Sequence, residues 1–253
     1  MKSSTAAMQA GHPHASVIGF ALALAAGYVD TVGFVALFGL FTAHVTGNLV
    51  LIGAELANPS HGVLIKLLAF PAFLFAIAAA RVIMIVALRS GLDAGPILLS
   101  VQTLLLLAFM LAGLLALPFD DSRSLLALTT GVLGSAAMGV QSAATKIVWG
   151  SPTPTTAMTG NVTQLVIDLV DVAWQGGGRP YLRKRVHEIL GTVLAFGVGA
   201  VLGAAAFTHF SMLALLLPIG LIAVLVPLSS RWVARRLSGA VAGAVHCRPP
   251  SAR

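Results

Sequence analysis

Residues 43–49 read AHVTGNL and residues 157–162 read AMTGNV, so the chain carries one short motif twice. Each Thr-Gly-Asn triplet interrupts an apolar run. Seven positions after each asparagine stands a carboxylate, Glu55 in the first copy and Asp168 in the second. The similarity extends backwards, because AAGYVD at 25–30 aligns with AAMGVQ at 136–141 once the second copy is allowed about two extra residues. Three features in one order and at nearly fixed spacing predict two copies of a single repeat.

Composition indicates a membrane protein. Hydrophobic residues make up 58% and charged residues 9% of the 253 residues, and the mean hydropathy is +0.96. A soluble domain of this length cannot bury so much apolar surface, so we expect the lipid bilayer to be its solvent. The net charge of +7 comes from short basic clusters between apolar runs, as topology signals do, so we expect no nucleic-acid partner. The single cysteine, Cys247, excludes an internal disulfide and a cysteine-built metal site.

Six apolar runs are long enough to cross a bilayer, at residues 16–40, 63–88, 97–117, 125–148, 186–207 and 212–228. These runs predict an all-α integral membrane domain over residues 15–232. We expect a disordered N-terminus at 1–14 and a basic, disordered tail at 233–253.

The basic clusters flank these six runs on one side of the membrane, which predicts cytoplasmic N- and C-termini. Lys66 fits this assignment less well. If both Thr-Gly-Asn segments crossed fully, eight spans would result, and the acidic turn at Asp120 and Asp121 would face inward. The charge rule therefore favours six spans over eight.

An odd number of spans in each half has a geometric consequence. Three spans turn the second repeat (about 124–229) upside down relative to the first (about 16–117), which gives an inverted repeat. Seven extended residues before Gly47 reach about 23 Å at ~3.3 Å each, enough to dip to the midplane, and a helix of about ten residues from Asn48 returns to the surface. A second short helix is expected from Asn161 to about Trp174. The alternative is that each triplet forms a surface turn that joins a span to an interfacial helix.

Asp30 is the strongest single candidate for a functional residue, because it lies near the middle of the first apolar run. An ionised carboxylate near mid-bilayer costs at least about 2.5–3.5 kcal/mol, so it is expected to pair, protonate or face water. Candidate partners are His44, Gln141 and the Thr-Gly-Asn backbone. Gln141 occupies the repeat-related position and cannot titrate, so a proton-coupled role would be asymmetric. The alternative is a shifted span boundary that places Asp30 near an interface.

The candidate substrate-binding or translocation residues come from both copies, with two carboxylates as secondary candidates: Asp30, His44, Thr46, Gly47, Asn48, Gln141, Thr159, Gly160 and Asn161, then Glu55 and Asp168. The spacing of Gly191, Ala195, Gly199 and Gly203 predicts a small-residue face for close helix packing. HExxH, GxSxG, Walker and Cys/His metal patterns are absent from the sequence, so we expect no enzyme, no metal site and no cofactor.

These motifs resemble those of a known family. GYVD at 27–30, Phe34 and HVTGN at 44–48 are similar to the YoaK-type family of bacterial membrane proteins. So are three further elements, MGVQ at 138–141, MTGN at 158–161 and Asp168. The resemblance covers about residues 16 to 230. It implies a multi-pass inner-membrane protein of about six spans, and it implies no substrate, because the family is uncharacterised.

Two functional hypotheses follow. The first is an inner-membrane transporter or channel for a small solute or ion, with a midplane site formed by both Thr-Gly-Asn segments and Asp30. The second is a non-transporting membrane scaffold in which the polar motifs only lock helices together. The expected partners are the lipid bilayer, a small solute or ion of unknown identity, and a second copy of the chain in a homodimer.

Overall fold

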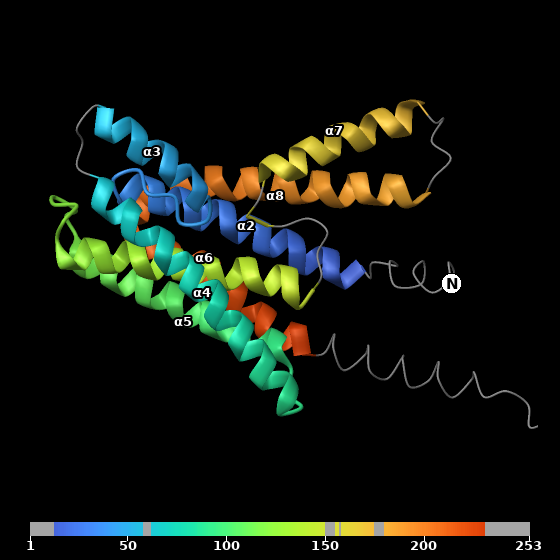
Figure 1. Ribbon diagram of the computed structural model, residues 1–253, viewed down its shortest axis with the longest axis horizontal. Helices are drawn as coiled ribbons and strands as arrows, with labels where there is room; N and C mark the ends of the chain where they lie inside the picture. Colours follow the sequence, from blue (N-terminus) through green and yellow to red (C-terminus); the bar gives the residue numbers. More distant parts are fainter. Residues whose placement is uncertain (1–12, 58–61, 150–154, 157, 175–179, 231–253) are drawn as a thin grey trace, which may run out of the picture.

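The computed structural model describes residues 13–57, 62–149, 155–156, 158–174 and 180–230. All regular structure in these ranges is helical (Figure 1). Five helical segments are long and apolar enough to cross a membrane, Val17–Ala36, Val63–Arg89, Ala94–Ala116, Leu125–Ile147 and Pro180–Ser230. The expected all-α integral membrane class is thereby confirmed. The segments expected to be disordered lie outside the described residues, except that Pro13 and His14 begin the first described helix.

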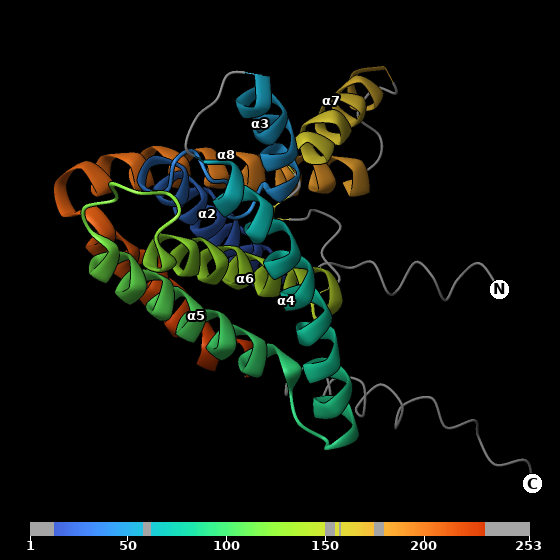
Figure 2. The same cartoon turned by 60° about the vertical axis from the view of Figure 1, so that its left-hand side comes forward.

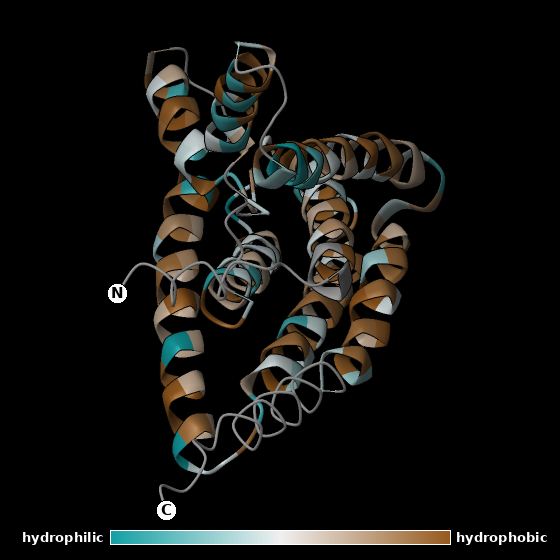
Figure 3. Cartoon of the chain, turned by 90° about the vertical axis from the view of Figure 1, so that its right-hand side faces the viewer, coloured by the Kyte–Doolittle hydropathy of each residue, from teal (hydrophilic) through white to brown (hydrophobic). Residues whose placement is uncertain are grey.

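The long helices lie close to where the sequence predicted them. They are α2 (Pro13–Ala36), α4 (Val63–Arg89), α5 (Ala94–Ala116), α6 (Leu125–Ile147) and α8 (Pro180–Phe210). Large apolar side chains are exposed on their outer faces, for example Phe75 on α4 and Val201 on α8. Hydrophobic colour accordingly dominates these helices in Figure 3. An apolar exterior of this kind is what contact with lipid requires.

The last apolar segment, Pro180–Ser230, does not form one straight helix. Its 51 residues would extend about 77 Å, more than twice the ~30 Å hydrocarbon core. After α8, Ser211 adopts a φ of 51° and begins the 3-10 helix η1 (Ser211–Leu215), and helix resumes up to residue 230. Figure 2 shows the chain turning back at this point. The break falls between the fifth and sixth apolar runs of the sequence, 186–207 and 212–228.

Two short helices, α3 (Val45–Ala57) and α7 (Met158–Trp174), contain the repeated motif. Both triplets lie in the first helical turn, so the expected start of α3 at Asn48 is wrong by three residues, as is the start of α7 at Asn161. The irregular backbone lies before the first triplet, in the turn at 37–44. The end of α7 at Trp174 agrees with the prediction. Boundary errors of this size are ordinary, because helix ends depend on local hydrogen bonds more than on composition.

The long helices of each half pack mainly against long helices of the other half. α2 packs along α8, and α6 packs along α4 and α5. The α2–α8 crossing is very close, since a Cβ built on Gly199 would lie 2.0 Å from the carbonyl oxygen of Leu24, and one on Gly27 would lie 2.1 Å from that of Phe196. The predicted close packing of the small-residue face is therefore confirmed. The short helices keep to their own halves, α3 against α4 and α7 against α8.

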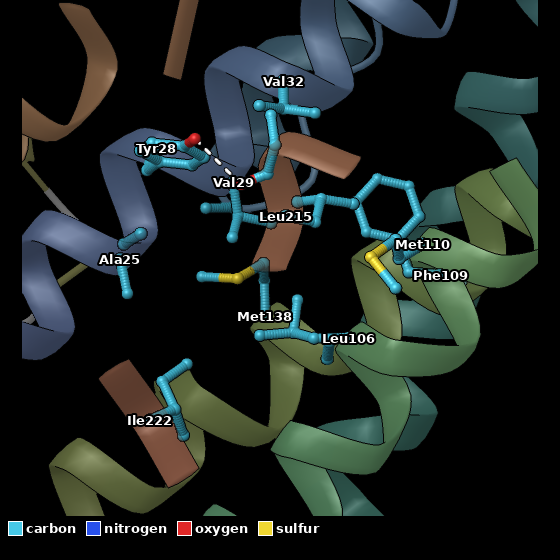
Figure 4. Close-up of a cluster of buried hydrophobic side chains, with 14 of the residues drawn as sticks. Ala25, Tyr28, Val29, Val32, Leu106, Phe109, Met110, Met138, Leu215 and Ile222 are labelled. Carbon is cyan, nitrogen blue, oxygen red and sulfur yellow. Dashed lines mark hydrogen bonds between the residues drawn. The ribbon is translucent and has the colours of Figure 1, made fainter. Parts of the chain in front are cut away.

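The main core lies where α2 meets α5, α6 and the region of η1 (Figure 4). Val29, Leu106 and Met138 are buried there. The buried Tyr28 hydroxyl donates a hydrogen bond of 2.9 Å to the carbonyl oxygen of Ala214, which ties the middle of α2 to η1. This core fixes α2, the helix that carries Asp30, within the protein.

Candidate polar site

Asp30 holds the chain segment that leads into α3. Its Oδ1 accepts hydrogen bonds from the backbone N–H of Ala43 at 2.7 Å and from Oγ1 of Thr42 at 3.3 Å. Its Oδ2 lies 2.7 Å from Nδ1 of His44. The residue is 4% exposed, although it lies only six residues, or about 9 Å, before the end of α2. Protein, not water, therefore surrounds this carboxylate, and three hydrogen bonds compensate its burial.

His44 is the more accessible partner of this pair, with 29% of its side chain exposed. An ionised Asp30 accepts the Nδ1–H of the ring, which leaves Nε2 as the acceptor nitrogen of the neutral imidazole. The ring centroid lies 5.1 Å from that of Phe196 on α8 and 6.3 Å from that of Phe41. The imidazole thus links the buried carboxylate of α2 to a less buried position beside α8. His44 was one of the expected partners of Asp30.

Asn48 is the buried member of the first triplet. Its Oδ1 accepts from the backbone N–H of Phe41 at 2.9 Å, and its Nδ2 donates to the carbonyl oxygen of Phe41 at 2.7 Å. One side chain therefore satisfies both backbone groups of a residue in the irregular turn. Thr46 is exposed and Gly47 is half-buried. Asparagine, with one donor and one acceptor on the same planar group, is suited to this bracing role.

Gln141 on α6 is the counterpart of Asp30 in the second half. Its Nε2 donates to the carbonyl oxygen of Leu22 at 2.9 Å and to Oγ1 of Thr155 at 3.2 Å. Its Oε1 accepts from Nε2 of Gln102 at 2.6 Å. The two halves thus use the same scheme, in which a buried polar residue on a long helix holds the chain before the short helix. The second version carries no ionisable group.

The second triplet repeats the orientation of the first. Asn161 is buried, and its Nδ2 lies 3.9 Å from Sδ of Met158. Thr159 and Gly160 are exposed on the outer side of α7. In both copies the asparagine is therefore buried and the threonine is exposed, whereas the glycine is half-buried in the first copy and exposed in the second.

The candidate residues form two clusters. Gln141 contacts α2 at Leu22, whereas Asp30 lies eight residues further along the same helix, or about 12 Å. Of the partners expected for Asp30, His44 and the backbone before the first triplet are in contact with it, and Gln141 binds elsewhere. The single shared site expected from the sequence is thus replaced by one polar cluster in each half.

The two secondary carboxylates each form an ion pair with the next long helix. Oε1 of Glu55 on α3 lies 2.6 Å from Nζ of Lys66 on α4, and this amine also donates to the carbonyl oxygen of Phe38 at 2.6 Å. Asp168 on α7 binds Arg185 on α8 through both carboxylate oxygens, with Nε at 2.6 Å from Oδ2. Both carboxylates therefore fasten a short helix to the start of the following long helix.

Among the contact residues that were not candidates from the sequence, Gln102, Lys66 and Arg185 each had a signal in it. Gln102 is an amide inside the apolar run at 97–117. Lys66 and Arg185 were read only as topology markers. Lys66 is 1% exposed and ion-paired, which explains why it fitted the charge rule poorly.

Metal ligands do not gather in the described ranges, where no group of three or more His, Cys, Asp or Glu residues is placed to hold a metal ion. The polar clusters are built instead from amides, hydroxyls, one imidazole and paired charges. Such groups exchange hydrogen bonds and protons.

Comparison with known proteins agrees with the membrane class. A family model described as "Protein of unknown function (DUF1275)" matches residues 18–228. The chain is 29% identical over 204 residues to the UPF0700 transmembrane protein YoaK of Bacillus subtilis (strain 168), a match that covers 79% of this chain and 88% of the relative. No solved structure matches. The resemblance drawn from the sequence motifs is therefore confirmed.

Proposed function

Since this chain belongs to the DUF1275 family of multi-pass membrane proteins, we propose that it is a transporter or channel for a small solute or ion in the bacterial inner membrane. Its functional centre is the Asp30 cluster, with the Gln141 cluster as its uncharged counterpart. Six spans cross the membrane, and both termini are cytoplasmic. We propose no enzymatic activity, since the sequence carries none of the HExxH, GxSxG, Walker or Cys/His patterns.

An inverted repeat is supported by how the halves pack. α2 and α6 are the first helices of their halves, and each packs along the second long helix of the other half. In Figure 1, α3 and α7 start near the middle of the molecule and run toward opposite ends. With 13 and 17 residues they extend about 20 and 26 Å, less than the ~30 Å hydrocarbon core. We infer that both are re-entrant helices that enter from opposite faces, as in many secondary transporters.

The observation that carries the proposal is the buried Asp30 and its contact with His44. An ionised Asp30 can accept all three of its hydrogen bonds, whereas a protonated carboxyl loses acceptor capacity. Proton exchange through His44 would therefore weaken the hold of Asp30 on Thr42 and Ala43, and so loosen the entry into α3. In this mechanism the charge of one buried group controls the position of a re-entrant helix.

Flux through proteoliposomes tests the proposal. Asp30→Asn keeps the size of the side chain and removes its charge, and Asp120→Asn makes the same change in an exposed turn as the control. Purified protein is reconstituted around a pH-sensitive dye and challenged with panels of inorganic ions, amines, carboxylates and neutral polar solutes. We expect solute-dependent proton movement in the wild type and in Asp120→Asn, and its loss in Asp30→Asn while that protein remains folded and monodisperse in detergent.

The scaffold function is a second candidate, favoured by a specific observation. Asp30 and Asn48 bind backbone groups of their own chain, as a purely structural lock does. On this reading Asp30→Asn lowers the melting temperature, and no solute class produces flux in the wild type. That combined result would overturn the transporter proposal.

A further inference from the structure

Two ion pairs brace opposite ends of the molecule. Glu55–Lys66 joins α3 to the start of α4, and Asp168–Arg185 joins α7 to the start of α8. The starts of α4 and α8 lie at opposite ends in Figure 1. We propose that these pairs are the two gates of the molecule and that the Glu55–Lys66 gate is the one that opens more readily. This inference rests on the proposed transporter function.

Each ion pair joins a short helix to the long helix that follows it, so its separation would let the short helix move. The carboxylate lies on the short helix whose entry is held by the Asp30 or the Gln141 cluster, and the cation lies on the long helix that follows. Lys66 also binds the carbonyl oxygen of Phe38, in the turn between α2 and α3. Separation of this pair would free the turn and α3 together. The chain beside Asp30 would then become accessible from that end.

The two pairs are unequal in their hydrogen bonds. Arg185 binds both oxygens of Asp168, Gln164 donates to the same carboxylate at 2.7 Å, and the hydroxyl of Tyr181 lies 2.9 Å from Nη1 of Arg185. A planar guanidinium that binds a carboxylate through two parallel bonds is a strong and geometrically defined pair.

Glu55–Lys66 lacks this reinforcement. The Lys66 amine contacts only Oε1 of the carboxylate, and Oε2 of Glu55 is buried with no hydrogen-bond partner among the described residues. A buried charged oxygen without a partner favours any state in which water reaches it. The pair therefore gains more from opening than the Asp168 pair does.

Thiol accessibility tests the two gates without a known solute. In a Cys247→Ser background, Ala43→Cys and Thr156→Cys place single thiols at equivalent, buried positions before α3 and α7. Each protein is reconstituted in vesicles of known orientation, and an impermeant maleimide is added to either side. We expect Ala43→Cys to be labelled faster than Thr156→Cys, each from one side only and from opposite sides.

Neutral variants then weaken one gate at a time. We expect Glu55→Gln to speed labelling of Ala43→Cys about tenfold and to leave Thr156→Cys unchanged, because one charge-assisted hydrogen bond is worth at least about that factor. Asp168→Asn should act on Thr156→Cys alone. The charge exchange Glu55→Lys with Lys66→Glu restores the ion pair but not the hydrogen bond to Phe38, so it should slow labelling relative to Glu55→Gln without reaching the wild-type rate, which separates loss of pairing from failure to fold.

Several outcomes would overturn the inference. Equal acceleration of both thiols by either variant indicates general loosening, and no acceleration indicates static anchors. Faster labelling of Thr156→Cys in the unmodified pairs would reverse the order of the gates. If each variant accelerates labelling on its own side but the protein moves no solute, the transporter proposal is rejected and the two ion pairs remain independent contacts that open. If the protein moves a solute but neither variant accelerates labelling on its own side, only the assignment of the ion pairs as gates is rejected.

Discussion

Asn48 braces the irregular turn before α3, because its amide satisfies both backbone groups of Phe41. Replacement by alanine leaves the half-buried N–H and carbonyl of Phe41 without these partners, at about 1–2.5 kcal/mol each. We expect Asn48→Ala to lower the free energy of unfolding by about 2–5 kcal/mol, measured by reversible denaturation in mixed detergent micelles. Thr46→Ala, an exposed neighbour, serves as the control and should change it by less than about 0.5 kcal/mol. Equal effects would show that the amide bonds contribute nothing.

Asp30 and Gln141 occupy equivalent positions in the two halves but differ in their chemistry. Both hold the chain before a short helix, but only Asp30 carries a titratable group and a histidine partner. Gln141 is held by Gln102, whose Oε1 is buried without a hydrogen-bond partner among the described residues. Of these two positions, only the one in the first half can exchange a proton through its side chain.

The crossing of α2 and α8 brings the backbones of the two helices close together. An alanine at 199 would place its Cβ 2.0 Å from the carbonyl oxygen of Leu24, and backbone cannot yield as a flexible side chain does. Gly197, on the same helix, has nothing within 4 Å of its Cβ position.

We therefore expect opposite effects from two similar substitutions on α8. Gly199→Ala forces α2 and α8 apart and should lower the free energy of unfolding by about 1–3 kcal/mol. Gly197→Ala should be neutral or stabilising by up to about 1 kcal/mol, because alanine is the better helix former. Thermal denaturation in one detergent compares the pair, and a stable Gly199→Ala protein would refute the close crossing.

For the whole molecule, the inverted arrangement predicts that α3 and α7 end on opposite faces of the membrane. Ala57 and Trp174, at the ends of these helices, are both exposed. In the Cys247→Ser background, Ala57→Cys should react with an impermeant thiol reagent from outside the cell only. Trp174→Cys should react only after the membrane is opened, because the proposed orientation places the basic cluster that follows it, Arg179 to Arg185, in the cytoplasm.

Reaction of both cysteines from the same face would reject the inverted repeat. The homodimer expected from the sequence stays a prediction that sedimentation in detergent can test, with a protomer mass of 25.9 kDa as the reference. The control for labelling is the cysteine-free chain, which should not react from either side.

The sequence alone determined the class of the protein, the positions of its long helices and its family. Those properties follow from local composition, since a run of apolar residues long enough to cross a bilayer satisfies its backbone only as a helix. The repeated triplet also marked both short helices, and its buried asparagines were among the candidate residues. The two short helices start at Val45 and Met158, three residues before the expected starts, because a helix boundary depends on hydrogen bonds that composition does not encode.

The sequence anticipated the contact of Asp30 with His44, but only the tertiary structure decided which of the other polar groups meet. Asp30 faces the chain before α3, whereas Gln141 binds Gln102 on α5 and Leu22 on α2, so one expected site became two clusters. The charge rule counts cations by position along the chain, and therefore it could not reveal that Lys66 is buried against Glu55. Such partners are chosen by how the helices pack, α3 on α4 for Glu55–Lys66 and α6 on α5 and α2 for Gln141, which the periodicity of a single helix does not encode.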